Sequence, residues 1–128
     1  MNPVSQEWVD KAEADFHVAL RESRARKHRS LDAVCFHAQQ CAEKYLKARL
    51  QDAGIAFPKT HSLPMLLNLT CTVEPLWSTL QPQAGRLNVY AVAFRYPGSS
   101  ATKEEAKQAL ADCHVVRREA RQTFGLAI

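Results

Sequence analysis

The residues best suited to chemistry in this sequence are a histidine near the middle of the chain and an arginine and a tyrosine after it, with an acidic and a basic residue before them. Imidazole exchanges a proton near neutral pH, and guanidinium binds phosphate through two parallel hydrogen bonds. Such side chains suit the binding of a phosphate ester, or its cleavage without a metal ion. No catalytic residue, metal site or cofactor is assigned. The candidate ligand-binding residues are Glu43, Lys44, Lys59, Thr60, His61, Arg95 and Tyr96.

His61 lies beside the start of a predicted helix, where free backbone N–H groups and the helix dipole favour an anion. With Lys59 and Thr60 it could receive a phosphate. The structural alternative is that Thr60 or Ser62 caps the helix while His61 packs or faces water. Tyr96 has an alternative as a core or interface aromatic residue.

Arg95 is expected at the end of a helix, where the dipole favours a cation. An ion pair with Glu43 or Asp15 would explain it as well as a ligand site would. Glu43 is placed to face a groove, whereas Lys44 and Lys47 fit a solvated helix face. These residues therefore have two explanations each, one functional and one structural.

Two further groups of polar residues have the same ambiguity. His37 and Gln40 share one helix face, which fits either a dimer contact or solvent exposure. The clustered arginines fit helix termini stabilised by cations, with RNA or an acidic protein as the second interpretation. These basic residues are Arg21, Arg24, Arg26, Lys27, His28 and Arg29, followed later by Arg117, Arg118 and Arg121.

The elements that position these residues are all predicted to be helices. Apolar residues recur at three- and four-residue spacing, and no segment alternates as a half-buried strand does. We expect an all-α, up-and-down bundle of four long helices plus one short helix, forming a single domain over residues 1–128. The stripes contain Trp8, Ala12, Phe16, Ala19 and Leu20; Leu31, Val34, Cys35, Ala38, Ala42, Tyr45, Leu46 and Leu50; Leu63, Leu66, Leu67 and Leu69; Leu87, Tyr90, Ala91 and Phe94; and Ala106, Ala109, Leu110, Cys113, Val116 and Ala120.

Helix boundaries follow from capping residues. Ser5, Ser30 and Ser62 are predicted N-caps, and Thr102 opens a capping box with the glutamate three residues later. Gly54 fits the end of the second helix. A loose stretch with one helical turn is expected around Trp77, between two prolines. The fourth helix should end near Arg95, because the proline at 97 disfavours helical geometry in the residue before it.

The amino-acid composition predicts a folded globular protein that does not cross a membrane. The chain has 128 residues, 46% of them hydrophobic, and a formal net charge of +4. Charged residues interrupt every apolar stretch, and the N-terminus lacks a secretory signal pattern. The four cysteines form no C-x-x-C pair, so we expect free thiols in a reducing cytoplasm.

Four segments in order resemble the HEPN domain family. Phe36–Leu50, FHAQQCAEKYLKARL, is very similar to the family's second-helix signature. Trp8 followed by Ala14-Asp15-Phe16 resembles its opening, Lys59–Leu63 resembles its K-T-H-D-L turn, and Arg95–Pro97 matches its R-Y-P. The resemblance implies a bundle of four or five helices, frequent homodimers, and pairing with a small nucleotidyltransferase, often in toxin–antitoxin operons.

The resemblance also implies possible ribonuclease activity, since many HEPN members cleave RNA without metal through an arginine followed four to six residues later by histidine. No histidine follows Arg86 or Arg95 at that spacing. Arg21 and His28 have the spacing, but they belong to the first predicted helix, where the family does not carry the motif. We therefore expect a non-catalytic, dimeric module that binds a nucleotide or RNA and acts with a nucleotidyltransferase. A ribonuclease with a divergent His/Arg site and a purely structural oligomerisation domain are the alternatives.

Overall fold

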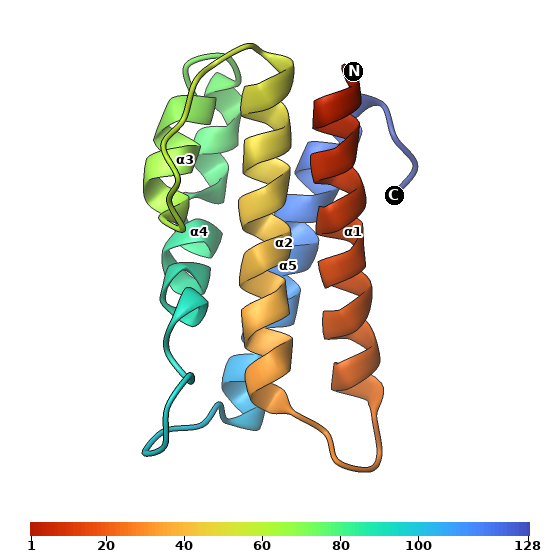
Figure 1. The fold of residues 1–128 in the computed structure, drawn as a ribbon, viewed down its shortest axis with the longest axis vertical. Helices are drawn as coiled ribbons and strands as arrows, with labels where there is room; N and C mark the ends of the chain where they lie inside the picture. Colours follow the sequence, from red (N-terminus) through yellow and green to blue (C-terminus); the bar gives the residue numbers. More distant parts are fainter.

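Three long helices frame the protein in the computed structural model, which describes residues 1–128. They are α1, Pro3–Arg24; α2, Leu31–Asp52; and α5, Lys103–Phe124. Figure 1 shows α2 in the middle, with α1 on one side, α3 and α4 on the other, and α5 behind. The chain contains no strand, so the predicted all-α bundle is confirmed.

The remaining side of the bundle is built from shorter pieces. They are α3, Leu63–Thr70; the 3₁₀ helix η1, Pro75–Leu80; α4, Gln81–Leu87; and the 3₁₀ turn η2, Asn88–Ala91. The predicted turn around Trp77 is confirmed by η1. The prediction of a long fourth helix that ends near Arg95 is wrong: α4 ends at Leu87, the 3₁₀ turn η2 ends at Ala91, and the chain after it is not helical. Asn88, the first residue of η2, ties this segment to α3, because its side-chain oxygen accepts a hydrogen bond from the backbone N–H of Leu63 at 3.0 Å.

The start of α1 differs from the prediction. Asn2 is the N-cap, and its side-chain oxygen accepts the N–H of Ser5 at 2.8 Å. Pro3 follows as the first helical residue, where its fixed φ and missing N–H are tolerated. Ser5, predicted as the cap, is instead buried inside the helix, and its hydroxyl donates to the carbonyl of Ala48 at 3.2 Å.

The other predicted boundaries are confirmed. Ser30 and Ser62 cap α2 and α3, and Thr102 forms a complete capping box with Glu105 at the start of α5. Gly54 follows the last residues of α2 with a φ of +70°, a conformation that glycine adopts without strain.

The core surrounds α2, which packs against α1, α3, α4 and α5. Its largest fully buried side chains include Trp77, Tyr45 and Leu46. Because neighbours cover α2 on nearly every side, its polar residues before the last one, Asp52, are partly or wholly buried and must find partners. No helix combines the length and apolarity needed to cross a membrane.

Candidate functional site

Glu43 is a buried carboxylate at the centre of the candidate site. Its side chain is 3% exposed, and Oε1 lies 2.8 Å from Nδ1 of His61. Oε2 accepts a hydrogen bond from Nζ of Lys47 at 3.1 Å. The amides of Gln39 and Gln40 complete the shell, with Nε2 atoms at 3.3 and 3.5 Å from Oε1. These partners compensate for the loss of water around the charge.

The pair fixes His61 while leaving its ring accessible. The side chain is 61% exposed, although Nδ1 faces Glu43. A carboxylate without a proton only accepts hydrogen bonds, so Nδ1 is the donor in this contact, and in the neutral ring Nε2 is then the acceptor. The backbone is held as well, because Nε2 of Gln39 donates to the carbonyl of His61 at 3.3 Å. The arrangement can present an imidazole of fixed orientation to a ligand.

Asp15 of α1 forms a second cluster with α2. Its carboxylate lies 2.7 Å from Nδ1 of His37 and 2.5 Å from Nζ of Lys44. Burial acts to raise the pKa of Asp15, but the hydrogen bonds and charges of His37 and Lys44 outweigh it and lower the pKa overall. Two histidines on this side of the molecule are thus each held by a buried carboxylate.

A hollow of about 230 Å³ lies between the first half of α2 and the chain that follows α4. Tyr90 and Phe94 stack in its wall with ring centroids 5.7 Å apart. Arg95 is exposed at its edge, and Nε donates to the carbonyl of Ala91 at 3.1 Å, which leaves both Nη groups available. The lining residues are Asp32, Ala33, Phe36, His37, Tyr90, Val92, Phe94 and Arg95.

The alternative ion pair of Arg95 with Asp15 or Glu43 is not formed, because both carboxylates have other partners. The structure places Arg95 with His37 in one hollow, whereas His61 lies outside its lining. Arg95 is therefore a free cation beside aromatic side chains, and the guanidinium can bind an anion.

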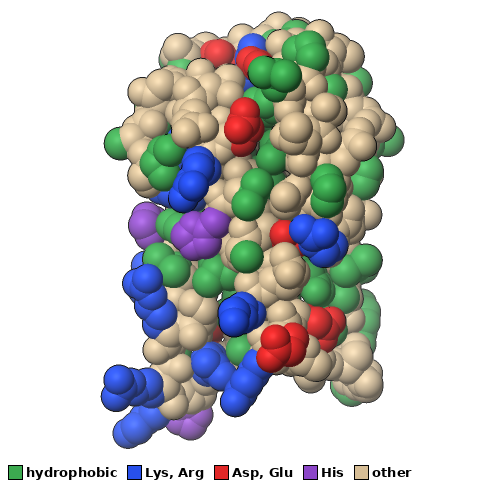
Figure 2. Space-filling view, turned by 180° about the vertical axis from the view of Figure 1, so that it is seen from behind, with side chains coloured by type: hydrophobic (Ala, Val, Ile, Leu, Met, Phe, Trp, Pro, Cys, Tyr) green, Lys and Arg blue, Asp and Glu red, His purple; other side chains and the backbone are tan.

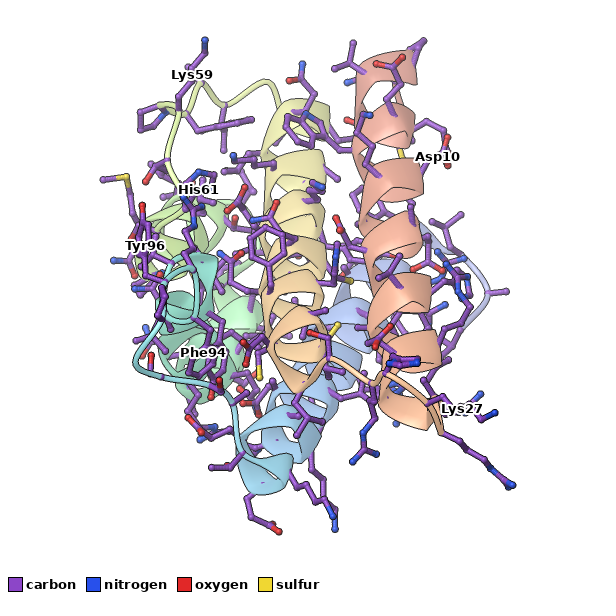
Figure 3. All side chains as sticks on the ribbon, turned by 60° about the horizontal axis from the view of Figure 1, so that its bottom comes forward. Asp10, Lys27, Lys59, His61, Phe94 and Tyr96 are labelled. Carbon is purple, nitrogen blue, oxygen red and sulfur yellow. The ribbon has the colours of Figure 1, made fainter.

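The remaining candidates lie around this centre. Tyr96 is 77% exposed, and Lys59 is exposed beyond His61. Thr60 has a local role, since its hydroxyl accepts the backbone N–H of Ser62 at 3.1 Å. Figure 3 shows Lys59, His61, Tyr96 and Phe94 on the same side of the molecule, away from Asp10 and Lys27 of the α1 side.

The prediction of a solvated face at Lys44 and Lys47 is wrong. Lys47 is only 8% exposed, and its Nζ lies 5.4 Å from the ring centroid of Trp8 and 6.0 Å from that of Phe57. The ion pair with Glu43 and these two rings stabilise the ammonium group in place of water. Lys44 connects α2 to α1 through Asp15.

Two arginines of α5 have structural roles, but as ion pairs between helices and not as the predicted cations at a helix end. Arg117 forms a bidentate pair with Glu13, with both distances at 2.8 Å, and is 9% exposed. Arg121 reaches the same carboxylate at 3.4 Å and the hydroxyl of Tyr45 at 3.1 Å. This network joins α1, α2 and α5 behind the candidate site.

Sequence reasoning missed Gln39 and the aromatic wall of the hollow. Gln39 is fully buried. The sequence held one indication of this, because Cys35 and Ala42, its neighbours at helical spacing, are core residues. The wall joins Phe36 to Phe94, which are distant in sequence and show no local signal.

The comparisons agree with this architecture. The family model described as "HEPN domain" matches residues 5–122. The crystal structure of an archaeal HEPN homologue superposes with a TM-score of 0.75 and 24% sequence identity, over 93% of this chain and 96% of the other. No curated protein matches the chain significantly. Because the family model spans nearly the whole bundle, including every residue of the site above, this chain belongs to the HEPN domain family.

Proposed function

We propose that the protein is a binding module that holds a nucleotide or a segment of nucleic acid at the hollow between α2 and the chain after α4. The observation that carries this proposal is the placement of Arg95 and His37 in one aromatic-walled hollow. Phosphate needs a cation with free N–H donors, and a base needs a ring or apolar surface to lie against. Arg95 offers the first, and Phe36, Tyr90 and Phe94 offer the second.

The two histidines extend this surface. His37 and His61 are each held at Nδ1 by a buried carboxylate, Asp15 or Glu43. Their orientation is set before a ligand arrives, which lowers the entropic cost of binding. Tyr96 and Lys59 lie on the same side and can contact a ligand longer than one nucleotide.

A second copy of the chain is the proposed cover for the apolar surface at the edge of the hollow, to whose lining Val92 itself belongs. Val89 and Val92 are 55% and 59% exposed, and Tyr96 is more exposed still. Apolar surface of this kind next to a binding site is typical of a protein interface. The partnership with a small nucleotidyltransferase, in a toxin–antitoxin-like pair, rests on the family resemblance, and an adjacent nucleotidyltransferase gene would support it.

The test is equilibrium binding of a short fluorescein-labelled single-stranded RNA, followed by fluorescence anisotropy. Arg95→Ala should raise Kd about tenfold or more, corresponding to about 1.5–3 kcal/mol for a charge-assisted contact. Arg95→Lys should restore little, because ammonium cannot form the bidentate contact. Lys11→Ala, which removes an exposed charge from α1, serves as the control. An Arg95→Ala protein that binds like wild type would contradict the proposal.

The second candidate function is a metal-independent ribonuclease. The observation in its favour is the pair of carboxylate-bound imidazoles on one side of the bundle, since such cleavage needs a proton acceptor and a proton donor. The binding module predicts no cleavage of single-stranded RNA in the presence of EDTA. Metal-free cleavage by wild type that is abolished by His61→Ala would make the ribonuclease the correct function.

A further inference from the structure

A second hollow, of about 400 Å³, lies between the end of α1 and the first half of α5. Its floor is apolar, formed by Leu31, Leu110 and two alanines of α5. Its charged lining residues are all basic, and no acidic residue contributes. The full lining is Ser23, Arg29, Leu31, Lys103, Ala106, Lys107, Leu110, Ala111 and His114.

The rim cations have no structural partner. Arg29, Lys103 and Lys107 are exposed, and none of them forms an ion pair. Lys103 is moreover the first residue of α5, where the helix dipole disfavours a positive charge. A role in helix stability therefore does not explain Lys103.

Two carboxylates of neighbouring segments, Glu22 and Asp32, accept backbone hydrogen bonds. Oε1 of Glu22 accepts the N–H of Ser30 at 2.5 Å, and Oδ1 of Asp32 accepts the N–H of Ala101 at 2.6 Å. Each side chain is therefore held in a loop contact and is not paired with a rim cation. Glu104, the residue after Lys103, is exposed and forms no ion pair with the rim cations either, so their N–H groups are available to a ligand.

The positive potential extends beyond the lining. Burial lowers the pKa of His114, and the charges of Arg117, Arg118 and Arg24 lower it further. Arg26 and Lys27 are exposed in the turn between α1 and α2. Figure 2 shows lysine and arginine side chains gathered over the lower part of this face, toward the end that carries this turn.

We propose that this groove is a second binding site, which holds a segment of single-stranded RNA with its phosphates on Arg29, Lys103 and Lys107 and one base over the apolar floor. Cations spaced along a rim match the repeated charge of a phosphodiester backbone. Leu31, Leu110 and the two alanines offer an apolar surface for the flat face of one base, and no Phe, Tyr or Trp takes part. The site is separate from the α2 hollow, since the two share no lining residue.

The test measures binding of a fluorescein-labelled oligouridylate at about 50 and about 200 mM salt, a range over which phosphate contacts weaken strongly. The double variant Lys103→Glu/Lys107→Glu should raise Kd at least about tenfold at the lower salt. It should also reduce the slope of log K against log salt by about 1.4, or about 0.7 for each lost phosphate contact. The helix dipole favours a glutamate at position 103, the first residue of α5, so we expect the double variant to fold like the wild type.

The matched control compares Lys107→Glu with Lys11→Glu, because both reverse one exposed lysine on a long helix. Only the first should weaken binding. Equal affinities for the two, or a double variant that binds like wild type, would overturn the proposal. An acidic peptide that displaces the RNA at equal charge concentration would also overturn it, in favour of a protein partner.

Arg95→Ala separates this site from the α2 hollow. If Arg95→Ala loses binding and the double variant binds fully, the second site is contradicted and the α2 site is supported. Loss only in the double variant supports the second site and contradicts the α2 site. Loss in both supports two contacts on one RNA.

Discussion

Nδ1 of His61 lies 2.8 Å from Oε1 of Glu43, so the turn before α3 is tied to a buried carboxylate of α2. Gln39 holds the same residue through its backbone carbonyl. The contact has two consequences, because it sets the imidazole for a ligand and closes one side of the bundle. A substitution at His61 or Glu43 should therefore change both the stability of the fold and the affinity for a ligand.

Glu43→Gln should lower the free energy of unfolding by about 3 kcal/mol, because it leaves the buried charge of Lys47 without its partner. Urea unfolding measures the change. Adding Lys47→Met should recover part of the loss, since an apolar side chain needs no ion pair. Glu7→Gln, an exposed carboxylate on α1, should change the value by less than about 0.5 kcal/mol. An unchanged stability in Glu43→Gln would show that the pair does not hold the bundle.

Acid should destabilise the protein partly through Asp15. Its pKa is lowered in the folded state by His37 and Lys44 despite burial, so its contribution is present above the unfolded pKa of about 3.9 and is lost as pH falls through the folded pKa. Melting temperature measured against pH should fall below about pH 5. Asp15→Asn should be less stable at neutral pH and show a shallower fall. The same slope in both proteins would refute the assignment to Asp15.

The cysteines should react in two groups. Burial raises the pKa of Cys35 to about 12, and burial with the adjacent Cys113 thiol raises the pKa of Cys41. Cys71 is only half-buried, so a thiol reagent should reach it first. All four should react after unfolding, and Cys71→Ala should remove the fast phase. Fewer than four thiols in an unfolded sample kept from air would contradict free cysteines.

The protein should be a dimer in solution, held in part by the exposed valines that follow α4. Light scattering should give twice the mass of the 14.4 kDa chain. Val92→Glu should give the monomer mass with little change in melting temperature, because Val92 is 59% exposed within one chain. Val115→Glu on α5 is the matched control. A monomer of wild type at micromolar concentration would be the contrary result.

The features predicted correctly from the sequence are those with local causes. Ser30, Ser62 and Thr102 cap helices through atoms within three residues, so their patterns are sufficient. The start of α1 was misplaced because Asn2 and Ser5 are both good caps. Burial of Ser5 against Ala48 of α2 decides between them, and that contact joins distant parts of the chain.

The candidate site was predicted in part for the same reason. Glu43, His61 and Arg95 stand out by type, but the sequence does not show which of them meet. Lys47 was predicted on a solvated helix face, where lysine is usually found, and only packing by Trp8 and Phe57 buries it. Partner choice depends on tertiary packing.

The most direct test of the α2 site is an NMR titration of ¹⁵N-labelled wild-type protein with a short oligouridylate. We predict chemical-shift changes at His37, Phe94 and Arg95, which line the α2 hollow, and at His61. If these residues show no shift changes, or if the changes are confined to Lys103, Lys107 and His114, binding at the α2 hollow is contradicted.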